Sequence, residues 1–247
     1  MTTTSKGYVL GRKLLSAVNL TDASSPTVRW GKNHQLTASI YALAKRRSDL
    51  FPFVGTDILV DGFPRSANTF MLHALKWSNP EYRYASHMHS SGPLKYAAKK
   101  NIPILTLIRE PRAAVVSLVV RDNLDLERCL HWYYDYYNCV RDYRNALVLA
   151  DFTSVTTNLS RVYSEISSSF DLTLNPPPCK AGDFKEVERM VVYSERRFAG
   201  GVVDPLKVSL PTREKLDAAP RYQRVIDTSS RLTSLLLRCE RVYHELV

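Results

Sequence analysis

The feature of this 247-residue chain that most constrains its fold is a short apolar run that breaks into a loop and then a helix. The run is Ile58-Leu59-Val60, the loop holds Gly62 and Pro64, and helical sequence follows from Phe70. A strand, a tight loop and a helix start together point backbone N–H groups and the positive helix end at one spot. The sequence therefore predicts an anion site after the first strand of the core.

The length of this loop matches that of a phosphate-binding P-loop, but the lysine of the P-loop is absent. In a P-loop, a glycine is followed after four residues by Gly-Lys-Ser/Thr. Here Gly62 is followed after four residues by Ala67-Asn68-Thr69, and the cation comes earlier, as Arg65. The loop is thus suited to a phosphate-like group rather than to a nucleoside triphosphate with Mg²⁺. The alternative is an ordinary strand-to-helix turn with a surface arginine.

A second stretch of the chain repeats the strand-loop-helix pattern. The apolar run 102–108 predicts a strand, and 113–120 predicts an apolar helix that Pro111 suits at its first turn. Arg109 lies at the strand end, and Ser117 lies eight residues on, about two helical turns into the helix. An arginine fork and a hydroxyl that converge would hold a second phosphate. The alternative is a salt-bridged strand end followed by a helix serine.

The alternation of strands with helices predicts the fold class. Strands are expected at 57–61, 82–87, 102–108 and 146–150, with helices between them. This alternation is typical of a three-layer α/β fold with a central parallel sheet and helices on both faces. Ligands of such sheets bind beyond the carboxyl ends of the strands.

The chain is predicted to be a single domain with three parts. These are an N-terminal helical arm (1–50), a nucleotide-binding core (51–155) and a helical C-terminal part (156–247). Helices are expected at 12–20, 34–48, 94–100, 124–145, 159–170, 184–197, 213–219 and 221–246. The helix 124–145 is rich in tyrosine, and we expect its aromatic side chains to pack the core rather than to line an acceptor pocket.

Three motifs, in order, resemble those of the sulfotransferases that use 3′-phosphoadenosine-5′-phosphosulfate (PAPS). Phe63-Pro64-Arg65-Ser66-Ala67-Asn68-Thr69-Phe70 resembles the family's 5′-phosphosulfate loop, Tyr-Pro-Lys-Ser-Gly-Thr-Thr-Trp. The stretch 108–117 resembles the 3′-phosphate motif, in which an arginine and a serine stand eight apart. Ser86-His87-Met88-His89-Ser90 falls where members of the family carry a catalytic histidine. The resemblance covers residues 55–122 and is loose elsewhere.

The resemblance implies a P-loop-like sulfotransferase fold, PAPS as co-substrate and 3′-phosphoadenosine-5′-phosphate (PAP) as product. It implies that Arg65 meets the sulfonate and that Phe70 stacks on adenine. It further implies cofactor-binding roles for Ser66, Ala67, Asn68 and Thr69 at the 5′-phosphate, and for Arg109, Ser117, Arg196 and Arg197 at the 3′-phosphate. For Arg196 and Arg197, a solvated helix end is the alternative. The sequence departs from the family where the loop lysine is Arg65, the loop glycine Ala67 and the tryptophan Phe70.

Transfer of a sulfuryl group to a hydroxyl or amine requires a base, stabilisation of charge and an in-line arrangement. Histidine is suited to be the base because its ordinary pKa of about 6.5 lies near working pH. His87 and His89 would point the same way in an extended segment, so one is expected to be the base and the other its support. A His-x-His pair also suits a metal, but no third ligand follows nearby, and no metal is predicted.

The composition favours an anionic ligand and reduced thiols. Lys and Arg number 34 against 24 Asp and Glu, a formal net charge of +10. The four cysteines show no Cys-x-x-Cys pairing, and no apolar run approaches the ~20 residues of a membrane span. The resemblance implies an enzyme with a small-molecule acceptor, and we expect it to be cytoplasmic. No helix shows the dense basic stripe of a nucleic-acid-binding protein, so neither nucleic acid nor a membrane is expected as partner. The alternatives are a P-loop-type kinase for a small metabolite and a non-catalytic protein that binds a nucleotide or nucleic acid.

Overall fold

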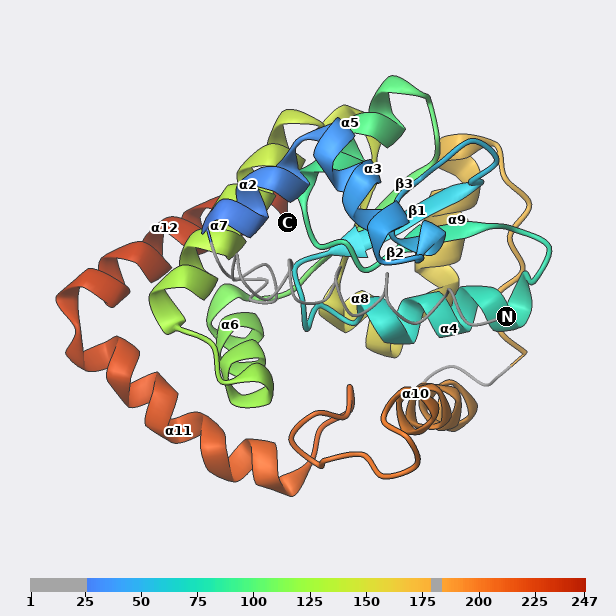
Figure 1. Cartoon of the computed structure of the whole chain (residues 1–247). Helices are drawn as coiled ribbons and strands as arrows, with labels where there is room; N and C mark the ends of the chain where they lie inside the picture. The colour runs from blue at the N-terminus through green and yellow to red at the C-terminus, as the bar shows by residue number, and fades with distance from the viewer. Residues whose placement is uncertain (1–25, 179–183) are drawn as a thin grey trace, which may run out of the picture.

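The centre of the molecule is a four-stranded, all-parallel β-sheet. The computed structural model describes residues 26–178 and 184–247. The strand order is β2-β1-β3-β4, with β1 at Ile58–Gly62, β2 at Tyr84–Ser86, β3 at Ile104–Ile108 and β4 at Val148–Asp151 (Figure 1). The predicted α/β class with a central parallel sheet is therefore confirmed.

The strands form where short apolar runs are long enough to cross the core and are covered on both faces. All five residues of β1 and all five of β3 are buried. Leu59 pairs with Ile104 and Ala85, and Leu105 pairs with Val148 in register. Burial on both faces explains why these strands are mostly apolar, with Asp61 in β1 and Thr106 in β3 as buried polar exceptions.

Helices cover both faces of the sheet and complete the three layers. Two separate apolar clusters, one on each side of the sheet, join the strands to these helices (Figure 1). One face is covered by α5 (Ser91–Lys99), α6 (Pro111–Asp122), α7 (Leu126–Asp142) and α12 (Ser230–Leu246). The other is covered by α4 (Asn68–Ser78), α8 (Phe152–Thr157) and α9 (Leu159–Phe170), and α10 (Lys185–Phe198) packs on α4.

The strand order places the loops after β1 and β3 side by side. The chain leaves β1 toward β2 on one side and returns to β3 on the other side of β1. The connections therefore diverge at the β1/β3 pair, which is the point where open parallel sheets bind ligands. The two loops that carry the predicted anion sites both begin there.

The tyrosine-rich helix α7 lies beneath these loops and fixes them. The aromatic side chains of Trp132, Tyr133, Tyr136 and Tyr137 are buried, so they pack the core as predicted. The Tyr137 hydroxyl donates to the Leu107 carbonyl at 2.7 Å and accepts from the Phe63 N–H at 3.2 Å. One side chain of α7 thereby ties the end of β3 to the loop after β1.

Some element boundaries differ from those predicted. The strand predicted at 82–87 ends at Ser86, because His87 and His89 adopt left-handed backbone angles, with φ of 68° and 53°. The reasoning that these histidines lie in an extended segment was therefore wrong. Pro220 does not end a helix: α11 runs from Arg213 to Thr228, and Ser229 caps α12 by accepting from Leu232 N–H.

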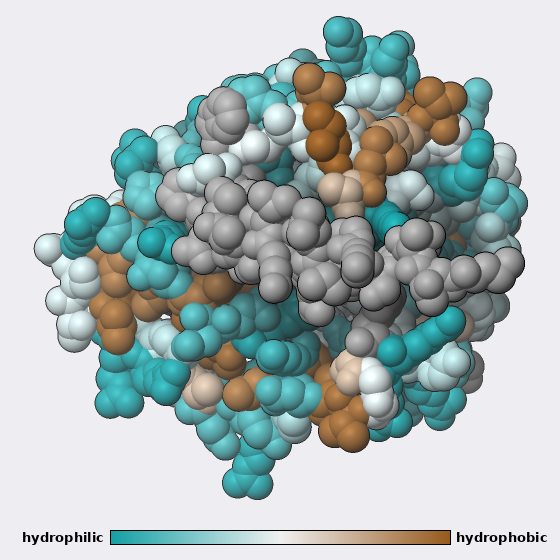
Figure 2. Space-filling view, viewed as in Figure 1, coloured by the Kyte–Doolittle hydropathy of each residue, from teal (hydrophilic) through white to brown (hydrophobic). Residues whose placement is uncertain are grey.

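The N-terminal arm begins with α2 (Pro26–Asn33) and α3 (Gln35–Ala44), followed by the 3₁₀ turn Ser48–Leu50. The helix predicted at 12–20 lies outside the described residues. Ala38 and Ala42 bury one face of α3, whereas Leu36, Ile40 and Leu43 on its other face are exposed. Figure 2 shows apolar side chains in brown over this part of an otherwise mostly hydrophilic face. A second 3₁₀ turn, Arg144–Ala146, leads into β4.

Candidate functional site

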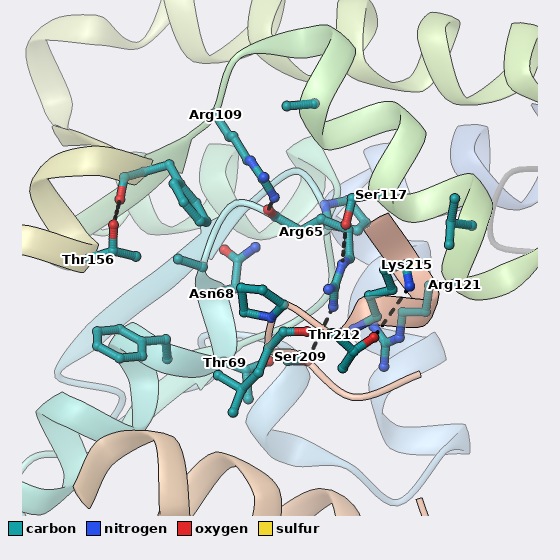
Figure 3. A pocket seen from close by; sticks show the side chains of 18 of the residues that line it. Arg65, Asn68, Thr69, Arg109, Ser117, Arg121, Thr156, Ser209, Thr212 and Lys215 are labelled. Carbon is teal, nitrogen blue, oxygen red and sulfur yellow. Dashed lines mark hydrogen bonds between the residues drawn. The ribbon is translucent and has the colours of Figure 1, made fainter. Parts of the chain in front are cut away.

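A cleft of about 680 Å³ opens at the carboxyl ends of β1 and β3. Its lining comes from six parts of the chain: the β1–α4 loop, the segment after β2, the β3–α6 loop with α6, helix α8, the start of α10, and the segment 209–223 that enters α11. Figure 3 shows polar side chains from three of these parts converging on one space. The cleft thus lies where the parallel sheet predicts a ligand.

The loop after β1 has a tightly held, left-handed backbone. Arg65 and Ala67 have φ of 71° and 69°, and Ala67 is the residue that precedes α4. The Asn68 side-chain amide closes the loop by donating to the Phe63 carbonyl at 2.9 Å. A left-handed alanine costs about 1 kcal/mol relative to right-handed geometry. Such strain is retained where the surrounding structure fixes the backbone, and it is concentrated at functional sites.

The Arg65 side chain joins this loop to α6. Its Nε donates to Ser117 Oγ at 3.0 Å, and its Nη1 lies 3.4 Å from Ser209 Oγ (Figure 3). Arg109 reaches back from the end of β3, and its Nη1 donates to the Arg65 carbonyl at 3.1 Å. The Arg109 guanidinium also lies over the Phe152 ring, 4.1 Å from its centre. The two anion sites expected from the sequence therefore share one space.

Arg65, Arg121 and Lys215 form a basic cluster at this end of the cleft. Burial, then the positive charges of Arg121 and Arg109, lower the pKa of Arg65 to about 10. Burial, then Arg65 and Arg121, lower the pKa of Lys215 to about 8. Both shifts have the sign expected where positive charges are crowded together and partly removed from water. An anion placed among these side chains would relieve that repulsion.

The Lys215 side chain is held in place by the backbone that precedes its helix. It is 8% exposed, and its Nζ donates to the Leu210 carbonyl at 2.7 Å and to the Val208 carbonyl. The same segment is anchored to α10, because Ser209 donates to the Glu195 carboxylate through its N–H at 2.8 Å and through its hydroxyl. Glu195 thereby positions Ser209 and partly offsets the charge of the basic cluster.

His87 is a neutral histidine that supports the loop. Its Nε2 lies 3.2 Å from Thr69 Oγ1. Burial, then the positive charge of a protonated His89, lowers the pKa of His87 to about 3. At neutral pH its imidazole is therefore uncharged.

His89 is fixed at three points. Its backbone N–H donates to Asp61 Oδ2 at 2.9 Å, and its carbonyl accepts from Trp132 Nε1 at 2.9 Å. Its ring Nδ1 lies 2.7 Å from the Gly62 carbonyl and 3.1 Å from Asp61 Oδ1. Since a carbonyl oxygen only accepts hydrogen bonds, Nδ1 carries the proton, and Nε2 of the neutral ring carries the lone pair. That tautomer has the form of a base.

The structure brings most of the predicted site residues together. Arg65, Ala67, Asn68, Thr69, Phe70, His87, His89, Arg109 and Ser117 all line the cleft. Ser66 is buried behind the loop, where its hydroxyl lies 3.4 Å from the Tyr137 hydroxyl. Phe70 packs edge-on against Phe184, with ring centres 5.7 Å apart.

The structure does not bring Arg196 and Arg197 to this cleft. Both lie in the last turn of α10, and Arg197 instead lines a second hollow over α4 and α10 with His73. Within 26–178 and 184–247, the lysines and arginines that line the cleft in addition to Arg65 are Arg109, Arg121, Lys185 and Lys215.

Four residues of the site were not predicted from the sequence, although a local sequence pattern could have indicated two of them. Asp61 is a carboxylate at the end of an apolar strand, and Arg121 lies one helical turn after Ser117, on the same helix face. Ser209 and Lys215 had no local signal, because they reach the cleft from a segment almost a hundred residues beyond Ser117.

No group of three or more His, Cys, Asp or Glu side chains is arranged to hold a metal ion within the described residues. None of the described helices is both long and apolar enough to cross a membrane.

Comparison with known proteins shows a distant likeness to solved structures. No family model and no curated protein sequence matches the chain. Among solved structures, the fold is similar to the crystal structure of mouse sulfotransferase SULT7A1 complexed with PAP. The likeness covers 76% of this chain and 90% of that chain, at 12% sequence identity and a TM-score of 0.40. Function therefore has to come from the geometry of the cleft.

Proposed function

We propose that this protein transfers the sulfuryl group of PAPS to a hydroxyl or amine of a small-molecule acceptor. The observation that carries the proposal is the convergence, in one cleft, of a left-handed loop at a helix start, a cluster of cations and a histidine in the base tautomer. The loop and the cations suit a doubly phosphorylated nucleotide. The histidine suits removal of a proton from the acceptor.

The residues of the cleft fit the two ends of the nucleotide. The backbone N–H groups of 66–69 and the start of α4 are suited to the 5′-phosphate. Arg109 and Ser117 are suited to the 3′-phosphate, together with Arg121 and Lys215. The phenyl rings of Phe70 and Phe184, which pack against each other, and of Phe152, which lies against the Arg109 guanidinium, are suited to contact adenine.

The same geometry favours PAPS over a nucleoside triphosphate. The loop has asparagine where a P-loop has lysine, and the Asn68 amide is engaged in closing the loop on Phe63. The cations instead lie beside Ser117 on α6. Cations beside Ser117 would favour a nucleotide that carries a 3′-phosphate over one that lacks it.

In the proposed reaction the bond between sulfur and the bridging phosphate oxygen breaks as sulfur bonds to the acceptor oxygen or nitrogen. His89 Nε2 accepts the proton that the acceptor loses. Arg65 stabilises the charge that develops on the sulfuryl group and on the departing 5′-phosphate oxygen of PAP. His87, uncharged at neutral pH, positions Thr69.

The test is transfer of ³⁵S-sulfate from PAPS across a panel of phenols, alcohols and amines, with the product identified by mass. Labelled product, absent with His89→Ala, supports the proposal. Mg²⁺-dependent phosphorylation from ATP without sulfuryl transfer would assign the protein to the kinases instead. Tight PAP binding with no transfer to any acceptor class would indicate a non-catalytic nucleotide-binding protein.

A further inference from the structure

We infer that Asp61 is a positioning residue that, together with the Gly62 carbonyl, holds His89 in its Nδ1–H tautomer and stabilises its protonated ring. Asp61 is only 2% exposed, and it sits on β1 directly before Gly62. Its Oδ2 accepts from the His89 N–H, and its Oδ1 lies 3.1 Å from the Nδ1 of the His89 ring. This inference rests on the proposed function for its consequence in the reaction, but not for the contact itself.

Both oxygens of Asp61 face hydrogen-bond donors. Oδ1 accepts from the Gly62 N–H at 3.0 Å and lies 3.1 Å from His89 Nδ1. Oδ2 accepts from the His89 N–H at 2.9 Å. A carboxylate can accept at both positions, but an amide cannot, because one of its two ends is itself a donor. The site therefore requires an acid, and not merely a polar side chain.

The buried Asp61 carboxylate also stabilises the protonated ring of His89. When His89 takes the proton of the acceptor, its ring becomes positively charged in a largely enclosed place. The Asp61 carboxylate, in contact with Nδ1, stabilises that imidazolium, as the aspartate does in a Ser-His-Asp triad. The other titratable neighbours of His89 give no such help, because His87 is uncharged at neutral pH and its ring centre lies 5.6 Å away.

The structure around His89 indicates that the Asp61 contact is part of a defined arrangement. His89 adopts a left-handed backbone, which is uncommon for a residue other than glycine. Asp61 holds the N–H side of this residue and Trp132 holds its carbonyl. Since Asp61 lies on a central strand, the base is fixed relative to the loop that begins one residue later.

The variant Asp61→Asn tests the inference. If the amide oxygen faces the His89 backbone, its NH₂ faces both Nδ1 and the Gly62 N–H, and the Nδ1 proton keeps only the Gly62 carbonyl as acceptor, so part of the ring population moves its proton to Nε2. We expect kcat to fall by 10-fold or more, with KM for PAPS and the affinity for PAP changed less than twofold. The matched control is Asp57→Asn, a carboxylate that caps the Arg83 N–H at the entry to the same strand, and it should leave kcat unchanged. An unaltered kcat in Asp61→Asn would overturn the inference.

The tautomer itself is measured by ¹⁵N NMR of the histidine rings, with His89 assigned by its absence in His89→Gln. In the wild-type protein we expect Nδ1 protonated and Nε2 unprotonated; in Asp61→Asn we expect Nε2–H to appear. Wild-type His89 protonated on Nε2 would overturn the inference even if the Asn variant failed to fold. This measurement needs no substrate, so it separates a wrong role for Asp61 from a wrong assignment of the reaction.

Discussion

Arg65 Nε donates to Ser117 Oγ at 3.0 Å, and this contact joins two stretches of sequence that each predicted a separate anion site. Arg65 is part of the loop after β1, but its guanidinium lies on the α6 side of the cleft. A positive charge at this position would stabilise any anion that binds between the loop and the helix. The cleft is therefore a single basic space with two sources of cations.

Replacing Arg65 by alanine should lower kcat/KM by about 100-fold to 1,000-fold, the range seen when one charge-stabilising group is removed. Arg65→Lys keeps the charge but loses the fork that contacts both Ser117 and Ser209, so we expect an intermediate loss. Steady-state kinetics with PAPS measure both. Arg83→Ala, at an exposed arginine outside the cleft, is the control. Wild-type turnover by Arg65→Ala would remove the proposed role.

Arg109→Ala should weaken binding of PAP by about 10-fold to 100-fold, because a charge-assisted bond to phosphate contributes about 1.5–3 kcal/mol. Binding of AMP, which lacks the 3′-phosphate, should change by less than about threefold. A change of that size corresponds to less than about 1 kcal/mol of binding free energy. Isothermal titration calorimetry with both nucleotides separates these results. Arg112→Ala is the matched control, because Arg112 pairs with Asp227 on the surface. An equal loss for PAP and AMP would place Arg109 elsewhere.

The two histidines should differ in their effect on catalysis. His89→Ala should lower kcat by about 100-fold to 10,000-fold, the usual contribution of a general base, while PAP still binds. His87→Gln should lower kcat by less than 10-fold, because His87 acts through Thr69. Single-turnover assays combined with PAP titrations check this difference. If His87→Gln were the more damaging change, the base would have to be reassigned.

His87 should also make the protein less stable in acid. Its pKa is lowered to about 3 in the folded state, whereas it is about 6.5 in the unfolded chain. Between these values the unfolded state binds the proton and the folded state does not, so the free energy of unfolding falls as pH falls below about 6.5. From pH 7 to pH 5 this contribution is on the order of 2 kcal/mol.

Urea unfolding at both pH values measures this effect. The loss of stability between pH 7 and pH 5 should be smaller in His87→Gln than in the wild-type protein. His244→Gln, at an exposed position of α12, should leave the loss unchanged. An identical loss in wild type and His87→Gln would show that His87 titrates freely.

Lys215 should couple nucleotide binding to proton uptake. Its pKa is lowered to about 8, so near pH 8 a sizeable fraction is neutral in the free protein. Phosphate bound beside Lys215 favours its charged form, and binding of PAP should then take up protons at pH 8 and few at pH 6.5. Calorimetry in buffers of different ionisation enthalpy measures this uptake. It should vanish in Lys215→Met and persist in Lys207→Ala, a lysine on the exposed turn before it.

Where the fold follows from local sequence, it was predictable. The strand-loop-helix units at β1–α4 and β3–α6 are set by apolar runs, Pro111 and the loop residues, and helix α9 lies at 159–170 as expected. The end of β2 was not predictable in this way, because Asp61 and Trp132 impose left-handed angles that no local pattern indicates. Pro220 was expected to break the C-terminal helix, but the side-chain cap at Ser229 sets the break instead.

The site was predictable only in part for a similar reason. Residues that follow β1, β2 and β3 meet because parallel strands end at one edge, and this rule can be applied to a sequence. Lys215 and Ser209 meet Arg65 through tertiary packing of a distant segment, for which Arg196 and Arg197 were mistakenly offered as the source of charge. The helix α10 contributes Glu195, which anchors Ser209, and not its arginines.

The Tyr137 hydroxyl, which accepts from the Phe63 N–H and donates to the Leu107 carbonyl, also fixes how two parts of the cleft are spaced. One phenol oxygen joins the loop after β1 to strand β3, so a displacement of either one strains the contact to the other. Removal of this oxygen in Tyr137→Phe would leave the loop and the strand without their shared partner.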